Sequence, residues 1–295
     1  MKYISTRNNA EGVSASEAIV RGMVPQGGLY VPDEIPTVDE ASMRKMVDLS
    51  YQDLAKQILA LYLEEFPAEE IDEMVNAAYN SESFDDAAVA PVVKIKDGLY
   101  SLELWHGPTA AFKDMALQLL PHLLVHSMRK TGVDKEVVIL VATSGDTGKA
   151  ALEGFKDVEG TRIITFYPHG GVSEVQELQM LTTGGKNTSA FAVKGNFDDC
   201  QRAVKEAFAN EALLKEVDAN SLLQTPSTGG ACCLKSCTIS PLICSLSRRV
   251  IFNLVMRLIS LYQRAISGTF SQAGLRVKWG FQLESSYVHP MPTMC

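Results

Sequence analysis

The chain has 295 residues, of which 46% are hydrophobic and 21% charged, values typical of a globular protein that can bury a core. Its formal net charge of −8 argues against nucleic acid as a partner, because phosphate binding needs clustered Lys and Arg side chains. The opening Met1-Lys2-Tyr3 leads into polar residues and not into a basic, apolar leader. We therefore expect a cytoplasmic protein with no nucleic-acid or membrane partner.

The composition changes at about residue 220. Up to that point 20 Lys and Arg stand against 34 Asp and Glu, whereas residues 221–295 hold 7 basic side chains and a single acid, Glu284. Five of the six cysteines also follow residue 220, and only Cys200 precedes it. Two regimes of composition in one chain call for separate interpretations of its two parts.

Residues 1–85 are predicted to form a small, mainly helical domain. Ser14 stands three residues before Glu17, which is the spacing of a helix-capping box, and Gly22 ends this helix. The segment QGGLYVP at 26–32 predicts a turn and a short strand. Apolar residues at helical spacing predict further helices over 54–66 and 71–79.

Between residues 86 and 220 strands are predicted to alternate with helices. The apolar, β-branched run 137–142 is typical of a buried parallel strand. Residues 100–105 alternate as a strand does, and a long helix is predicted from Asp114 to Leu124. This alternation predicts an α/β domain with a parallel sheet. Two more strands are predicted at 163–167 and 191–194, and a capping box at Ser173 with Gln176.

The segment HGPTAAFKD at 106–114 follows a predicted strand, where open α/β sheets bind ligands. Its lysine, Lys113, stands directly before a helix, at the end that repels cations. It can be a surface lysine whose stem lies over Phe112. It can also be a lysine whose pKa is lowered by partial burial and positive potential, so that its amine attacks a carbonyl group. The spacing leaves both interpretations open.

A second loop, TSGDTG at 143–148, also joins a predicted strand to a helix. Hydroxyls and backbone N–H groups at a helix start favour an anion such as carboxylate or phosphate, although an ordinary βα turn carries the same residues. A nucleotide-binding P-loop does not fit. Lys149 is followed by Ala150, and no glycine stands five residues before Gly148.

Taken in order, the segments 26–32, 106–114 and 142–148 resemble the threonine synthase family, and the resemblance extends over about residues 1–220. It implies the type II fold of pyridoxal-phosphate enzymes, similar to tryptophan synthase β, with a parallel-sheet domain preceded by a small helical domain. It also implies a lyase of threonine biosynthesis that cleaves a carbon–oxygen bond to phosphate. That reaction converts O-phospho-L-homoserine and water into L-threonine and phosphate, with pyridoxal 5'-phosphate as cofactor.

The resemblance also implies roles for single residues. Lys113 would bind the cofactor covalently and move protons at the α and β carbons of the substrate, and Phe112 would wall the cofactor. His106 and Asp114 are weaker candidates, because an Asp at a helix start is more often a cap. No metal ion is implied. The carboxylate and phosphate of the substrate would be held by Ser144, Gly145, Asp146, Thr147 and Gly148, with Lys149 as a helper.

Residues 221–295 lack the two segments that the family supplies next, a Ser-Ser-Ala-Asn-Ser segment and a Gly-Asn-Phe-Gly-Asn loop for the cofactor phosphate. The cysteines at 232–237 form no C-x-x-C pair, so they do not match a zinc site. The apolar run at 250–262 is too short and too charged to span a bilayer. As a protein segment, this tail therefore indicates no site.

A shifted reading frame accounts for the tail. When each codon takes the last base of one written codon and the first two of the next, residues 221–242 permit SSANSINWGRLLPQIVYYFSAY. From Ser260 the same shift permits FVVPTGNFGNILAG. Both missing segments return in order, and the written residues restrict the second base of each restored codon. We therefore predict that residues 221–295 are an out-of-frame translation without a native-like fold.

Three hypotheses follow for the function. The first is a threonine synthase encoded in full by the correct frame. The second is a catalytically inactive, truncated fragment that docks on other proteins through its helical front domain. The third is a related pyridoxal-phosphate lyase such as threonine dehydratase, against which the segments 26–32 and 106–109 argue. The oligomeric state does not follow from the sequence.

Overall fold

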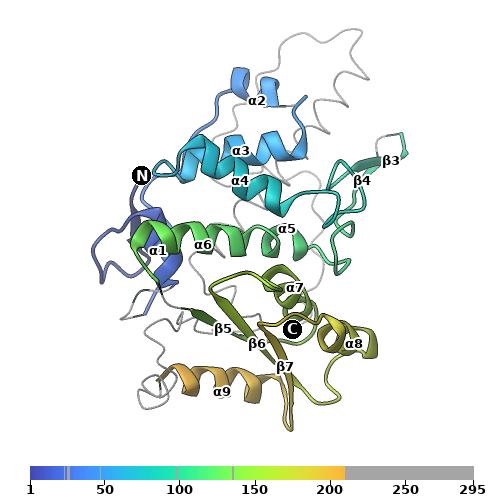
Figure 1. Ribbon diagram of the computed structural model, residues 1–295. Coiled ribbons are helices and arrows are strands. Elements are labelled where there is room, and N and C mark those ends of the chain that lie inside the picture. The colour runs from blue at the N-terminus through green and yellow to red at the C-terminus, as the bar shows by residue number, and fades with distance from the viewer. Residues whose placement is uncertain (23, 25–26, 47, 98, 135, 210–295) are drawn as a thin grey trace, which may run out of the picture.

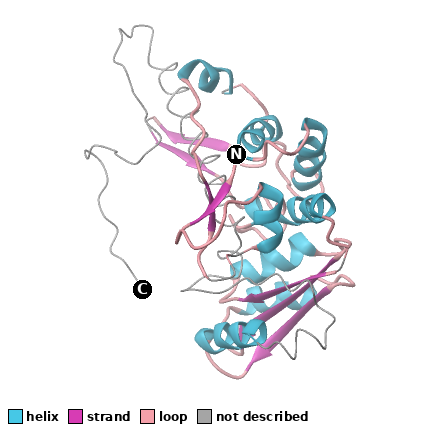
Figure 2. Ribbon diagram, turned by 90° about the vertical axis from the view of Figure 1, so that its left-hand side faces the viewer, coloured by secondary structure: helices cyan, strands magenta, loops and turns pink. Residues whose placement is uncertain are grey.

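The computed structural model describes residues 1–209 apart from 23, 25–26, 47, 98 and 135. The predicted out-of-frame tail therefore lies outside the described residues. A mainly helical front part and a parallel β-sheet lie at opposite ends of the molecule (Figures 1 and 2). Within this described part of the chain, no helix is long and apolar enough to cross a membrane.

The front part combines a small antiparallel pair of strands with four helices. Ser14 and Glu17 form the predicted capping box at the start of the first helix, and Gly22 ends it with a φ of 67°. The two later helices begin three residues earlier than predicted. The side chain of Ser50 caps the first of them by accepting from the N–H of Asp53, and Pro67 precedes the second without a side-chain cap. The elements are β1 (Tyr3–Ser5), α1 (Ala15–Arg21), β2 (Tyr30–Pro32), α2 (Glu40–Met46), α3 (Tyr51–Tyr62) and α4 (Ala68–Ala78).

An antiparallel hairpin of β3 (Val92–Lys96) and β4 (Leu99–Leu102) leads into the loop of Lys113. The strand predicted over 100–105 therefore ends at Leu102. Ile95 and Leu99 of this hairpin are exposed, at 59% and 47% of their surface. The hairpin consequently contributes little to the core.

The helix predicted from Asp114 to Leu124 is two helices, α5 (Asp114–Leu117) and α6 (Leu120–Thr131). Pro121 stands in the first turn of α6. Proline has no N–H group and its ring clashes with the carbonyl four residues earlier, here that of Leu117, so a continuous helix is disfavoured. The prediction of one long helix was wrong for this reason.

The α/β part contains the predicted parallel sheet, with the strand order β5-β6-β7. All six side chains of β5 are buried, as the apolar run predicted. Helix α7 covers one face of the sheet and α9 the other, so the sheet lies between two helical layers (Figure 1). The elements are β5 (Val137–Ala142), α7 (Asp146–Phe155), β6 (Thr161–Pro168), α8 (Glu174–Thr182), β7 (Thr188–Val193) and α9 (Phe197–Ala209).

One continuous apolar core joins the two parts. Helix α6 packs against α1 and α4 of the front part and also against α5 and α7. The hydroxyl of Tyr79, which follows α4, donates to the carbonyl of Met115 in α5 over 2.7 Å. The front part is therefore bound directly to the helix that follows Lys113.

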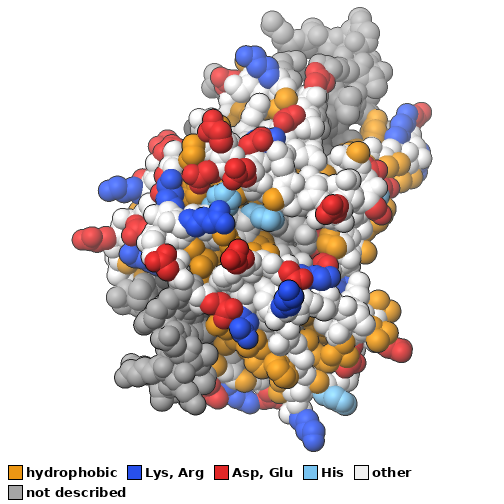
Figure 3. Space-filling model, viewed as in Figure 1, with side chains coloured by type: hydrophobic (Ala, Val, Ile, Leu, Met, Phe, Trp, Pro, Cys, Tyr) orange, Lys and Arg blue, Asp and Glu red, His pale blue; other side chains and the backbone are white. Residues whose placement is uncertain are grey.

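Apolar side chains also remain exposed at the sheet end of the molecule. Figure 3 shows hydrophobic side chains gathered there, over the region of the sheet and α8. Three exposed residues of α8 stand three positions apart, and one exposed phenylalanine belongs to β7. These residues are Val175, Leu178, Leu181 and Phe191.

The close approach of α7 to α5 gives a test of this packing. A Cβ atom added to Gly154 would lie within van der Waals overlap of the carbonyl oxygen of Leu117. Helix propensity alone predicts that Gly154→Ala stabilises the protein by about 1 kcal/mol. We expect instead a net loss of about 2 kcal/mol in the free energy of unfolding, because overpacking outweighs propensity.

Chemical denaturation of the parent and the variant measures this difference. Ala77→Gly, at an exposed position of α4, is the control. It measures the difference in helix propensity between Ala and Gly at a position where the side chain makes no close contact. A Gly154→Ala protein as stable as the parent would contradict the observed packing.

Candidate functional site

The two loops singled out in the sequence meet at one edge of the sheet. The loop 143–145 leaves the carboxyl end of β5, and the loop 106–113 enters α5, which packs against α7. Ligands bind at this edge in open α/β sheets. We call these the anion loop (143–148) and the lysine loop (106–113).

The carboxylate of Asp114 organises the lysine loop. Asp114 is fully buried and accepts hydrogen bonds from the N–H of Thr109 (2.9 Å), the hydroxyl of Thr109 (2.7 Å) and the N–H of Ala111 (3.4 Å). Burial raises the pKa of Asp114, and these bonds together with the charge of Lys149 offset the effect only in part. Asp114 is therefore more than a helix cap.

Small residues allow the lysine loop to fold around this carboxylate. A Cβ atom on Gly107 would lie 2.5 Å from the Cβ of Asp114, so a larger residue there would displace the carboxylate. Ala110 has a φ of 53°, in the left-handed region, and its N–H donates to the carbonyl of Gly107 over 3.0 Å. The spacing of Gly107, Ala110 and Asp114 in the motif follows from this turn.

Lys113 and Phe112 lie on the open side of the loop. The ring of Phe112 is 55% exposed, and the Nζ of Lys113 lies 4.9 Å from its centre. Among the residues that the structure describes, the ammonium of Lys113 forms no ion pair and no hydrogen bond. Its charge does act on Asp146 of the anion loop, so the two loops are electrostatic neighbours.

The anion loop uses one of its own hydroxyls to hold its backbone. Thr143 Oγ1 accepts hydrogen bonds from the N–H groups of Gly145 (3.0 Å) and Gly148 (2.9 Å). Two of the N–H groups that the sequence offered to an anion are therefore already bound. Ser144 is exposed and Thr147 half-buried, and within the described ranges neither hydroxyl has a hydrogen-bond partner.

Lys149 is buried, in contrast to Lys113, and joins the two loops. It is 7% exposed, and its Nζ donates to the carbonyl oxygen of Thr109 over 3.1 Å. The same nitrogen forms an ion pair with Asp146 Oδ1 over 3.2 Å. Partial burial works to raise the pKa of Asp146. Hydrogen bonds from Gln176 and Lys149, with the charges of Lys149 and Lys113, outweigh it and lower that pKa.

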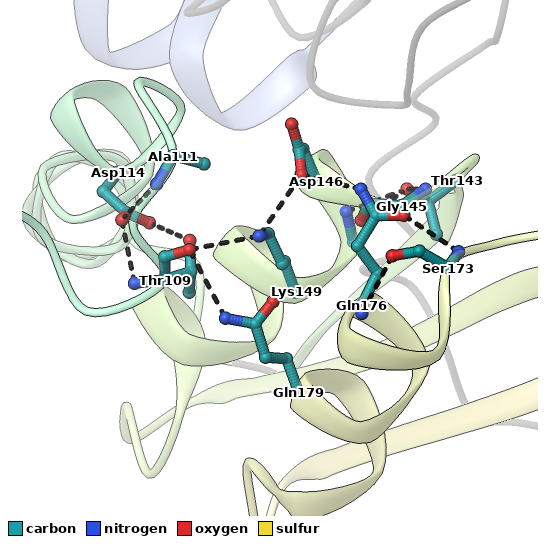
Figure 4. Close-up of polar contacts among 11 residues, drawn as sticks. Thr109, Ala111, Asp114, Thr143, Gly145, Asp146, Lys149, Ser173, Gln176 and Gln179 are labelled. Carbon is teal, nitrogen blue, oxygen red and sulfur yellow. Dashed lines mark hydrogen bonds and ion pairs between the residues drawn. The ribbon is translucent and has the colours of Figure 1, made fainter. Parts of the chain in front are cut away.

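Helix α8 contacts both loops through two glutamines. Gln176 completes the predicted capping box with Ser173, and its Nε2 also donates to Asp146 Oδ1 over 2.8 Å. Gln179 Nε2 donates to the carbonyl oxygen of Thr109 over 3.4 Å. Figure 4 shows these contacts, with Lys149 between the two loops.

His106 binds residues outside this centre. Its Nδ1 lies 2.6 Å from Asp85 Oδ1 and its Nε2 lies 2.9 Å from Glu103 Oε2. The hydrogen bond with Glu103 raises the pKa of His106, burial lowers it, and the hydrogen bond with Asp85 raises it further, for a net increase. The residue thus fixes the start of the lysine loop to the preceding chain.

Sequence reasoning missed four residues of this arrangement: Thr109, Thr143, Gln176 and Gln179. Thr109 and Thr143 stood inside the quoted motifs, but their contacts depend on how each loop turns. Gln176 was noticed only as part of a capping box. Gln179 lies 70 residues from its partner Thr109, and no local pattern marks it.

The chain is similar in sequence to proteins of one known family. The family model described as "Threonine synthase N terminus" matches residues 2–79. The threonine synthase of Pseudomonas aeruginosa is 41% identical over 216 residues, which are 73% of this chain and 45% of that protein. Threonine synthase-like 2 of Mus musculus is 39% identical over 224 residues, 75% of this chain and 46% of that protein.

Solved structures of threonine synthases are also similar to this chain. A PLP-bound threonine synthase from Brucella melitensis superposes with a TM-score of 0.70 at 36% identity, over 85% of this chain and 52% of that one. The threonine synthase from yeast gives 0.70 at 28% identity, over 90% and 56%. The chain thus spans about half the length of the proteins it matches. Over the part that these proteins match, the chain is a member of the threonine synthase family.

Proposed function

We propose that the complete protein is a threonine synthase, which converts O-phospho-L-homoserine and water into L-threonine and phosphate with pyridoxal 5'-phosphate as cofactor. The observation that carries this proposal is the meeting of the two loops, with the free amine of Lys113 next to the anion loop. The alternative, a related lyase such as threonine dehydratase, has less support, because the matched relatives carry the threonine synthase name.

The residues present fit the cofactor. The amine of Lys113 has no acidic partner among the described residues and lies over an exposed aromatic ring, so it is available to a carbonyl group. When bound, pyridoxal phosphate supplies an electron sink for the substrate's α carbon. Lys113 then holds and moves protons at the α and β carbons, while Phe112 covers one side of the site.

The anion loop would hold the substrate. Ser144 and Thr147 present hydroxyls without partners in the described part of the chain, at the start of α7, where the helix dipole favours negative charge. Gly145 and Gly148 provide the tight backbone, and Asp146 is oriented by Gln176. The carboxylate and phosphate of the substrate are the anions that this loop suits.

We also propose that the chain consists of a front domain (1–85), the beginning of the cofactor-binding domain (86–220) and an out-of-frame tail (221–295). The match to about half the length of the relatives supports this division, as does the change of composition at residue 220. Resequencing the coding DNA around the codon of Asn220 tests it directly. An intact frame there would refute the out-of-frame tail.

The first prediction concerns the cofactor lysine. With the frame restored, Lys113→Ala should abolish the absorbance change that pyridoxal phosphate gives on binding, because the attacking amine is lost. A spectrophotometric titration of parent and variant measures it. Lys205→Ala, at an exposed position of α9, is the control and should bind as the parent does. Borohydride reduction that labels another lysine in the parent would contradict the assignment of Lys113.

The second prediction concerns the anion loop. In the frame-restored protein, Thr147→Val should reduce turnover of O-phospho-L-homoserine and leave cofactor binding nearly unchanged. Losing one hydrogen bond to a charged group costs about 1.5–3 kcal/mol. Steady-state kinetics of the holoenzyme measure the loss. A fall in cofactor affinity with normal kinetics of the remaining holoenzyme would assign the loop to the cofactor.

The third prediction is that the chain as written has no threonine synthase activity, because its tail lacks the glycine-rich loop that would bind the cofactor phosphate. Low solubility should accompany this loss, since apolar residues of α8 and β7 remain exposed. The measurement is phosphate release from O-phospho-L-homoserine by the written and the frame-corrected protein. Equal activity of the two would show that the tail is a functional part of the enzyme.

A further inference from the structure

Two acceptors at the site each receive two hydrogen-bond donors. The carbonyl oxygen of Thr109 accepts from Lys149 Nζ (3.1 Å) and Gln179 Nε2 (3.4 Å). Asp146 Oδ1 pairs with Lys149 Nζ (3.2 Å) and accepts from Gln176 Nε2 (2.8 Å). Because Gln176 and Gln179 stand one turn apart on α8, the contacts close into a ring (Figure 4). We call these five residues the loop ring.

Within the ring, the ammonium of Lys149 is already bound to other groups of the protein. Its side chain is 9% exposed, and its ammonium already has a carbonyl and a carboxylate as partners. A substrate anion would have to displace Asp146 to reach it. Taking Asp146 away from this pair would leave the buried ammonium of Lys149 without its counter-charge, which is costly. We therefore expect the ammonium of Lys149 to keep its partners in the protein when the substrate binds.

Helix α8 depends on the ring for its own position. Met180 is the only residue of α8, as described, that is fully buried. Its apolar residues Val175, Leu178 and Leu181 are exposed. The polar side chains that hold α8 to the molecule are Gln176, Gln179 and Glu177, which accepts from the hydroxyl of Tyr167 over 3.0 Å. The two glutamines thus connect a lightly packed helix to both loops.

We propose that Lys149 is a positioning residue and not a ligand of the substrate. With Gln176 and Gln179 it fixes the distance between the lysine loop and the anion loop. The inference rests on the proposed function, since it assigns Lys149 a part in presenting Lys113 to a cofactor and substrate. Reaction rates depend steeply on such placement, because groups held in the reacting geometry need no further ordering.

The experiment uses the frame-restored protein as parent, together with pyridoxal phosphate. Lysines that react are fixed with borohydride and quantified by peptide mapping, with exposed Lys205 as internal reference. Lys149→Met should lower the label at Lys113, relative to Lys205, at least about five-fold, as expected when a hydrogen bond to a charged group is lost. Lys149→Arg, which keeps the charge and the donors, should restore most of the label.

Two further variants separate placement from folding. Lys156→Met, which removes a half-exposed ammonium paired with Glu153 just after α7, should leave the label at Lys113 unchanged. The double variant Gln176→Leu with Gln179→Leu should lower the label at Lys113 while the protein still unfolds in one cooperative transition, because both glutamines are half-buried and lie outside the apolar core. If Lys149→Met fails to fold, the label at Lys113 in this double variant tests the inference instead.

A cofactor-free measurement distinguishes failure of the inference from failure of the proposed function. In the apoprotein an amine-directed acylating reagent should modify Lys149 at least about ten-fold more slowly than Lys205, because a buried, hydrogen-bonded amine is not free to react. The double glutamine variant should raise that reactivity.

Each outcome then has one meaning. A parent chain labelled at Lys205 and not at Lys113 refutes the role of Lys113, and the reactivity of Lys149 still decides whether the ring exists. Equal Lys113 label in parent and Lys149→Met, or a Lys149 as reactive as Lys205, overturns the inference and leaves the proposed function in place.

Discussion

The arrangement of the site depends on how closely α7 approaches its neighbours. At one end of the helix, a Cβ atom on Gly148 would overlap Thr143 and lie 2.8 Å from Thr165 of β6. At the other end, one on Gly154 would overlap the last residue of α5. These two glycines bring the helix within reach of both the sheet and the lysine loop. Only at this spacing can the side chain of Lys149 contact the carbonyl of Thr109.

Burial of opposite charges follows from that approach. Asp114 and Lys149 are both buried, and each is surrounded by partners that suit its charge, three donors for the carboxylate and two acceptors for the ammonium. Unpaired, either group would carry a large desolvation cost. Lys113, a neighbour of Asp114 in sequence, has no ion-pair partner among the described residues. Lys113 and Lys149 thus differ both in how exposed they are and in whether their ammonium groups have partners.

The sequence predicted the local features of this fold well. The capping boxes at Ser14 and Ser173 and the buried parallel strand 137–142 are present, because each rests on a pattern only a few residues long. The prediction of one long helix from Asp114 was wrong. The spacing of apolar residues predicts a helix but does not show that Pro121 lacks the N–H group that a continuous helix needs. The contacts of Gln179 and Lys149 with Thr109 could not be predicted. They join residues 70 and 40 positions apart and depend on the finished packing.

The shared core gives the front part a mechanical connection to the site. The hydroxyl of Tyr79 binds the carbonyl of Met115, two residues after Lys113, and α6 packs between the helices of the front part and α7. The front part is therefore joined to α5 by a direct hydrogen bond and through the packed helix α6. The front helices act as a foundation for the lysine loop and not as a separable module. Sequence changes in the front helices can therefore alter the edge where the two loops meet without contacting it.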